Sequence, residues 1–436
     1  MTAAASKLIE QTPASGRTSA PALWAIHALG FYMVGKMFYA FGGGSVQPAD
    51  VLLGTLAIFM TPPSALRRMW AENKLFFFFV AWVISINIFW SAYLTQTSFL
   101  TSASYYVFNF LVVSCAFATR SRDPDLFDKY IANWILLSIA IQFAVIIAKG
   151  GSSRGIGTFN NPNQLSYWSV CALSILLVVR RNQAKSIDLP FQLMALWCQI
   201  SSASRAGFGA GVMLFLIWAF FALETPLKKL FGILGLCSTF IVLFATPLAE
   251  KYITKSEQFS IAEQRVQKES DESELEVRNY NRIFEYYEYT VFGAGEGELK
   301  RFRQQAGVDI DLEIHSSIGT VYFSYGVIGF ALFISFLGSL AYRLGIRRAV
   351  YLVPVFVYGM THQGLRFSFF WLLIGSLMSA ASRQQGSAGP REVPRKPHLP
   401  YKPVSIKPRG AEFLSAIAEG RPGGWDGQPS ADKPSK

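Results

Sequence analysis

Long apolar runs separated by short polar connections dominate the chain. Leu75–Leu94 and Tyr130–Ala148 each hold about the 20 residues that an α-helix needs to cross the hydrocarbon core of a bilayer. Runs of this kind recur along the sequence and predict an all-α polytopic membrane protein with about 12 transmembrane helices. The predicted spans lie at residues 23–40, 47–61, 75–94, 99–119, 130–148, 164–179, 189–203, 207–223, 230–247, 315–341, 350–362 and 367–381.

The polar segments complete the predicted organisation. The first apolar run begins only near Leu23, which indicates an uncleaved first helix and not a signal peptide. The long loop before the tenth helix holds 15 of the 28 acidic residues, and its length favours a partly helical cap. The tail is rich in Pro, Gly, Lys and Arg, so we expect it to be disordered and attracted to anionic lipids. The predicted parts are an N-terminal cytoplasmic segment (1–22), helices 1–9 (23–247), a periplasmic loop (248–314), helices 10–12 (315–381) and the basic tail (382–436).

Composition and charge narrow the class of protein. The chain is 51% hydrophobic and only 16% charged, against about 25% charged in a soluble domain, which excludes a soluble or disordered protein. The net charge of +12 would suggest nucleic acid in a soluble chain, but here the basic residues lie mainly between spans and in the tail. Their first role is topological, so no nucleic-acid partner is predicted. With the N-terminus inside, the inner short loops hold 14 Lys or Arg, among them Arg120, Lys129, Arg180 and Arg348. The outer short loops hold four, namely Lys149, Arg154, Arg205 and Arg366.

Neither the cysteines nor the acidic residues form a metal-binding pattern. All four cysteines lie inside apolar runs without metal-ligand spacing, and we expect small buried hydrophobes at Cys115, Cys171, Cys198 and Cys237. Asp309-Ile310-Asp311 has the D-x-D pattern of metal-dependent glycosyltransferases, but in an acidic loop we interpret it as solvated charge. No metal and no cofactor is predicted. Lys36 and Asp50, at the outer ends of the first two spans, are expected to pair without a catalytic role.

Arginines on the outer face are candidate functional residues, because a cation on that side is costly to place. Arg154 precedes a Gly- and Asn-rich loop that enters a helix, and its asparagines Asn160, Asn161 and Asn163 could hold a phosphate or a sugar. The alternative is local: Asn161 caps the helix before Pro162, and Arg154 pairs with an interfacial lipid. The capping role and a ligand role are compatible.

Two further arginine clusters follow. Arg205 stands among small residues that permit close helix approach, so it can face a cavity or snorkel to the interface. In the long loop, Arg278 and Arg282 are four residues apart and share a helix face. They could grip a diphosphate, or pair with nearby glutamates on a solvated helix.

His315 lies where the long loop re-enters the membrane. An imidazole titrates near neutrality and can take a proton from a hydroxyl acceptor without a metal. Gly319, Gly326 and Gly329 lie on about one side of the following helix and would allow tight packing that fixes the histidine. The alternative is a structural interfacial histidine.

These clusters together resemble the O-antigen ligase and O-antigen or exopolysaccharide polymerase superfamily. The ligase signature is His, then Asn, Ser or Gln, nine residues, and G-x-x-G. Here His315-Ser316 is followed by nine residues and by Gly326-Val327-Ile328-Gly329. The arginine and asparagine loop, the Ser204-Arg205-Ala206-Gly207 element and an arginine-containing loop helix ending in Gly293-Ala294-Gly295 look like the family's and occur in the same order.

The resemblance implies a C-type glycosyltransferase-like fold in the bacterial inner membrane and a metal-independent, inverting transfer on the periplasmic side. The donor would be a glycan on undecaprenyl diphosphate, and the acceptor either lipid A core or a growing glycan. His315 would activate the acceptor hydroxyl, and Arg154, Arg205 and Arg278 would bind the diphosphate leaving group. The interval from the loop arginine to the G-x-G turn is shorter than usual in the family, which leaves Arg282 as the alternative to Arg278.

Other functions stay open at this stage. The acceptor is undetermined, and a chain-length regulator is a candidate partner if the protein is a polymerase. A transporter or flippase of lipid-linked oligosaccharide would also suit 12 spans with intramembrane cations. A non-catalytic scaffold that acts through the basic tail is a third hypothesis.

Overall fold

The computed structural model describes residues 20–42, 46–149, 154–180, 188–222, 279–302 and 313–387, with isolated positions between 226 and 234. These residues belong to one compact unit, Met1–Ser387. Throughout this part of the chain the secondary structure is helical and no strand occurs, which confirms the all-α prediction for it. Most of the predicted loop, Arg278 and Asp309-Ile310-Asp311 included, and the tail after Ser387 lie outside the described residues.

Helices occur within every predicted span except 230–247, which lies largely outside the described residues. In chain order they are α1 (Ala20–Gly35), α2 (Pro48–Met60), α3 (Pro63–Glu72), α4 (Lys74–Leu94), α5 (Ser98–Arg122), α6 (Pro124–Lys149), α7 (Pro162–Val179), α8 (Asp188–Ser201), α9 (Arg205–Ile217) with the π-helical turn η2 (Trp218–Ala222), α14 (Asn281–Glu285), the 3-10 turns η4 (Tyr287–Tyr289) and η5 (Leu299–Phe302), α15 (Ser317–Leu344), α16 (Ile346–Ala349), η6 (Val350–Leu352), α17 (Val353–Gly359) and α18 (Ser368–Ser387).

Within the described ranges, five helices are long and apolar enough to cross a membrane, namely α4, α5, α6, α7 and α15. The pair α2 and α3 would make a sixth span, but it is bent by 92°. The protein is therefore of the α-helical membrane class, whereas the count of 12 spans is not confirmed.

Two segments differ from the simple helical pattern. Pro62 and Pro63 end α2 and start α3, an amphipathic helix in a stretch expected to be a connection. The predicted span 350–362 is a 3-10 turn followed by the seven-residue α17, far below the length of about 20 residues that crosses a bilayer.

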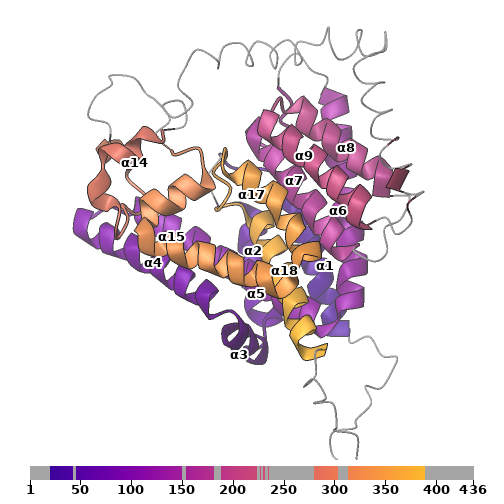
Figure 1. Ribbon diagram of the computed structural model, residues 1–436, viewed down its shortest axis with the longest axis horizontal. Helices are drawn as coiled ribbons and strands as arrows, with labels where there is room; N and C mark the ends of the chain where they lie inside the picture. Colours follow the sequence, from indigo (N-terminus) through magenta and orange to yellow (C-terminus); the bar gives the residue numbers. More distant parts are fainter. Residues whose placement is uncertain are drawn as a thin grey trace, which may run out of the picture. The chain divides into compact units, whose positions relative to one another are not determined.

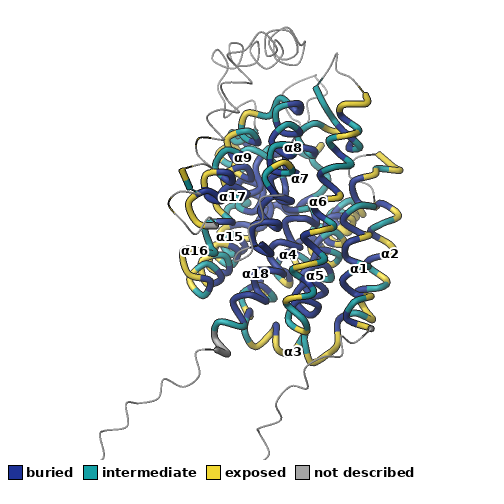
Figure 2. Tube along the Cα trace, turned by 90° about the vertical axis from the view of Figure 1, so that its right-hand side faces the viewer, coloured by how far each residue is buried: buried dark blue, intermediate teal, exposed yellow. Residues whose placement is uncertain are grey.

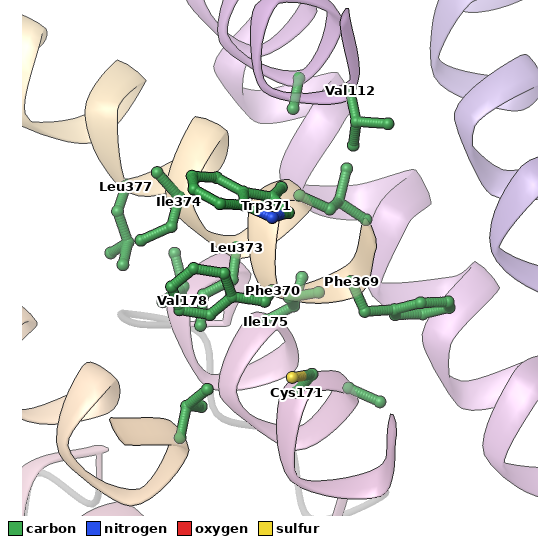
Figure 3. Packing of buried hydrophobic residues seen from close by; sticks show 14 of the residues in the cluster. Val112, Cys171, Ile175, Val178, Phe369, Phe370, Trp371, Leu373, Ile374 and Leu377 are labelled. Atoms are coloured by element: carbon green, nitrogen blue, oxygen red, sulfur yellow. The ribbon is translucent and has the colours of Figure 1, made fainter. Parts of the chain in front are cut away.

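The core is organised around α18, which packs against α5, α7 and α15. Figure 1 shows α4 and α15 on one side of α18, with α6 to α9 gathered on the other. Buried positions run through the middle of this bundle, and exposed ones lie on its outside (Figure 2). Trp371, Phe370 and Leu373 of α18 meet Ile175 of α7 in a closely packed layer (Figure 3). Helices α7 and α18 are apolar on nearly all sides because neighbours surround them.

Cys115, Cys171 and Cys198 are buried free thiols inside this core, as predicted. Cys237 lies outside the described residues.

Candidate functional site

Three of the sequence motifs are the starts of helices. The side chain of Asn161 accepts a hydrogen bond from the N–H of Asn163 at 2.8 Å and caps α7. Ser204 caps α9 through the N–H of Gly207, and Ser316 caps α15 through the N–H of Gly319. These side chains satisfy N–H groups that a helix leaves unpaired at its start. The expected cap at Asn161 is confirmed.

The starts of α7 and α9 are tied to each other. Arg154 donates from Nε to the carbonyl oxygen of Ser202 at 2.8 Å and from Nη2 to Oδ1 of Asn163 at 3.0 Å. Tyr358 Oη donates to the carbonyl oxygen of Asn163 at 3.1 Å and lies 3.1 Å from Oγ of Ser204. Two helix N-termini, each with a partial positive charge, therefore share one end of the bundle.

A cavity of about 290 Å³ lies at this end and is called the His315 cavity below. Its volume is close to the lower limit of about 300 Å³ for small-molecule sites. It brings together His315 with the predicted residues Asn161 and Asn163. Sequence reasoning gave no site role to its other lining residues, Lys36, Tyr39, Tyr105, Gln164, Tyr167, Glu313, His362, Gln363, Arg366 and Phe367.

The other predicted arginines and Asn160 lie outside the lining of this cavity. Arg154 contacts the cavity only indirectly, through its hydrogen bond to the lining residue Asn163. Arg205 is exposed at the first position of α9. Asn160 is also exposed and donates to the carbonyl oxygen of Phe41 at 3.2 Å.

Arg282 is buried and lies over the rings of Phe302 and Phe323, at 5.2 and 5.9 Å from their centroids. These rings form a small second core with Ile314, the residue before His315. Arg282 therefore stabilises the packing under the histidine. It also lines a small pocket that shares Glu313, Gln363 and Arg366 with the His315 cavity.

The principal feature that the sequence did not reveal is a charge network around Arg366. Its Nε lies 3.0 Å from Oε1 of Glu296, and its Nη1 lies 2.8 Å from Oε1 of Glu313. Arg366 belongs to the connection between α17 and α18. Burial alone would lower the pKa of its guanidinium, but the two carboxylates outweigh burial and raise it. Arg366 is therefore a permanent cation.

Glu296 is the centre of this network and is only 3% exposed. Its Oε1 also accepts from Nε2 of Gln363 at 2.8 Å, and its Oε2 accepts from Oη of Tyr325 at 2.6 Å. Its backbone N–H donates to Oδ1 of Asn87 at 2.8 Å. The long loop, α4, α15 and the 360–367 connection are thus joined at one carboxylate. In the sequence, the signal for Arg366 was that it is a predicted outer-face arginine four residues after His362.

Two histidines line the cavity. The ring of His362 contacts the stacked rings of Tyr167 and Tyr358, with centroids 5.4 and 5.5 Å away. Burial, with a smaller effect of His315, lowers the pKa of His362 to about 4. His362 is therefore neutral at pH 7. Its carbonyl oxygen accepts from N–H and Oγ of Ser317, which ties it to the residues after His315.

Lys36 and Asp50 form the expected ion pair, with 2.6 Å between Nζ and Oδ2. Both side chains are buried, and Lys36 lines the His315 cavity. The pairing is confirmed, and it places one more cation at the candidate site.

The two glycine motifs form one structural unit. Gly326 has φ 65° and ψ −175°, so α15 is broken where a continuous helix was predicted. The break leaves the carbonyl oxygens of Phe323 and Ser324 to accept from the N–H groups of Ala294 and Gly295, at 2.9 and 2.8 Å. A Cβ on Gly326 would lie 2.2 Å from the carbonyl oxygen of Val291. The G-x-G turn of the loop therefore docks on the first glycine of G-x-x-G.

Among the described residues, no group of three or more His, Cys, Asp or Glu side chains could hold a metal ion. No protein-family model and no curated protein matches the chain.

Proposed function

We propose that this protein is a bacterial inner-membrane glycosyltransferase of the O-antigen ligase or polymerase type. It transfers a glycan from undecaprenyl diphosphate to a hydroxyl acceptor at the His315 cavity, on the periplasmic side. The resemblance of its motifs to that superfamily is the starting point of the proposal. The observation that carries it is the meeting of His315, Asn161 and Asn163, from separate motifs, in one cavity.

The proposed reaction needs a base at the acceptor. His315 takes the proton of the acceptor hydroxyl while the hydroxyl oxygen attacks the anomeric carbon of the donor glycan. The bond from that carbon to the diphosphate oxygen breaks, with inversion, and the lipid diphosphate leaves with the electron pair. His362 is neutral, so it adds no positive charge beside the base.

Negative charge on the departing diphosphate needs compensation. The N-termini of α7 and α9, joined by Arg154, offer positive dipole ends. Arg205 is exposed at the start of α9, where it can reach a bound anion. Guanidinium groups match phosphate oxygens in bidentate geometry and stabilise charge without a metal. Arg278, or Arg282 in its place, remains the candidate from the loop.

The direct test is glycan transfer by purified protein from an undecaprenyl diphosphate-linked donor in EDTA. His315→Ala is expected to lower the rate about 100- to 10,000-fold through loss of the base. Arg154→Ala is expected to lower it about 100-fold, because Asn163 and the α7 terminus lose their position. His27→Asn is the matched control: His27 lies on α1, accepts from Nε1 of Trp134 at 3.2 Å and is not among the residues that line the cavity.

Equal rates for His315→Ala and the wild type would refute the assigned base. If no acceptor gives turnover but liposomes with the protein move the lipid-linked glycan across the bilayer unchanged, the flippase hypothesis replaces the transferase. A deletion strain then distinguishes the acceptors: loss of polymerase leaves a single capped repeat, and loss of ligase accumulates lipid-linked polymer.

A further inference from the structure

A second cavity, larger than the first, lies where the C-terminal ends of α5, α7 and α18 meet the start of α6 and the short α16. Its volume is about 380 Å³, within the range of about 300–1,000 Å³ typical of ligand sites. It shares no residue with the His315 cavity. We call it the basic cavity, and the transfer reaction makes no use of it.

The lining of the basic cavity carries an excess of positive charge. Five cations, Arg120, Lys129, Arg180, Arg348 and Arg383, face two carboxylates, Asp125 and Asp128. Asp128 is fully engaged by Arg120, whose Nε and Nη2 donate to its two oxygens at 2.7 and 2.9 Å. Arg180 pairs with Asp188 behind the lining, with 3.5 Å between Nε and Oδ1. The remaining three cations have one carboxylate, Asp125, among the lining residues, so the cavity attracts anions.

Some guanidinium nitrogens in this cavity are buried and lack acceptors. Nε of Arg348 and Nε of Arg383 are shielded from solvent and have no hydrogen-bond partner among the described residues. A buried polar group without a partner is unfavourable, because it has lost its hydrogen bonds to water. An anionic oxygen bound in the cavity would supply the missing acceptors.

Ordinary helix capping explains only part of this arrangement. Cations near helix C-termini interact favourably with the helix dipole. Arg120 Nη1 donates to the carbonyl oxygen of Ser376 at 2.6 Å, and Arg348 Nη1 donates to that of Ala380 at 3.1 Å, but both carbonyl groups lie before the last turn of α18. Capping does not account for the open volume or for the two buried Nε atoms.

We propose that the basic cavity binds a phosphate group, carried by the headgroup of an anionic phospholipid or by a soluble phosphate compound. Guanidinium forks fit phosphate oxygens, and basic pockets between membrane helices suit phosphorylated headgroups. Arg348 and Arg383 hold the phosphate, with Lys129 at the exposed edge of the cavity.

The experiment uses the full-length protein in detergent and four probes: cardiolipin, phosphatidylglycerol, phosphatidylcholine and inorganic pyrophosphate. Native mass spectrometry measures binding, and thermal unfolding measures stabilisation. If a headgroup is the ligand, cardiolipin or phosphatidylglycerol binds and raises the unfolding temperature more than phosphatidylcholine does. If the ligand is soluble, pyrophosphate has the larger effect. Equal weak effects of all four probes would overturn the proposal.

Variants locate the binding. Arg348→Gln and Arg383→Gln are expected to weaken binding of the preferred probe at least about tenfold, the effect of losing about 1.4 kcal/mol. Lys129→Gln changes an exposed lining side chain, so it tests the site without threatening the fold. Arg347→Gln, which alters an exposed residue of α16 outside the lining, is the matched control. Binding that is unchanged in the three lining variants, or equally reduced in the control, would place the phosphate elsewhere and refute the assignment.

Discussion

Arg366 is held by two carboxylates that come from different parts of the chain, Glu296 in the loop and Glu313 before α15. A guanidinium held in this way keeps its position, because each ion pair limits its rotation. It is therefore a fixed cation in the wall of the His315 cavity, beside the carboxylate of Glu313, which lines the same cavity. Fixed charges of this kind are more effective than mobile ones in a catalytic site, since they need no reorganisation during the reaction.

The ion pair between half-buried Arg366 and buried Glu296 predicts a large stability effect when the cation alone is removed. Arg366→Gln leaves the buried carboxylate of Glu296 without its cation, and we expect a loss of about 3–5 kcal/mol in the free energy of unfolding. The double variant with Glu296→Gln removes that charge as well and should recover part of the loss. Denaturant unfolding in detergent measures both, with Arg347→Gln as the control. A loss below about 1 kcal/mol in the single variant would contradict a tightly coupled pair.

At the scale of elements, the break in α15 is what joins the loop to the membrane helices. The turn at Gly293 and Gly295 pairs with carbonyl oxygens freed at Gly326. Nε1 of Trp90 on α4 donates to the carbonyl oxygen of Gly293, and Nε1 of Trp82 donates to that of Tyr325, both at 2.9 Å. The carbonyl oxygens of α15 that lack a helical hydrogen bond at the break accept hydrogen bonds from the loop and from α4 instead.

Two glycines of the same helix make a matched test of this joint. Gly326→Ala should displace the loop turn, because of the positive φ and the contact of 2.2 Å with Val291. Gly338→Ala adds a methyl group in open space and should be neutral or stabilising by up to about 1 kcal/mol. Limited proteolysis of the loop and glycan transfer report the difference. Equal protease resistance and equal activity in the two variants would show that the joint is dispensable.

The elements that local chemistry determines were predictable, and those that depend on distant partners were not. Asn161 before Pro162 is a cap signal in the sequence itself, and the cap is present. The break at Gly326 depends on carbonyl groups that meet the loop only in three dimensions. Likewise, Glu296 and Arg366 are 70 positions apart, and no spacing rule connects a loop glutamate to that arginine. Arg278 and span 230–247 lie outside the described residues and stay predictions.

At the scale of the whole molecule, the basic cavity and the His315 cavity are lined by residues that were predicted to lie on opposite sides of the membrane. Arg120, Lys129, Arg180 and Arg348, all predicted to be inside, line the basic cavity. Arg366, predicted to be outside, lines the His315 cavity. The charge rule and the packing therefore agree on which residues share an end, while the compartment that each end meets stays a prediction.

Thiol labelling tests that orientation. Arg205→Cys and Arg347→Cys introduce thiols at exposed positions, whereas the described native cysteines are buried. A membrane-impermeant maleimide should label position 205 in intact spheroplasts and position 347 only after the membrane is opened. The unsubstituted protein is the background control. The reverse pattern would invert the topology and move the proposed transfer to the cytoplasmic side.

The connections of Glu296 also set an order of assembly during synthesis. The ribosome makes Asn87 first, Tyr325 only after the loop, and Gln363 and Arg366 close to the end of the membrane region. A nascent chain whose loop is complete still holds the carboxylate of Glu296, whose cation has not yet been translated. The His315 cavity therefore closes last, and a truncated chain that ends before residue 363 cannot complete it. Such an incomplete product can already dock its loop turn on α15 and on Trp90 of α4, but the buried carboxylate of Glu296 stays without its cation.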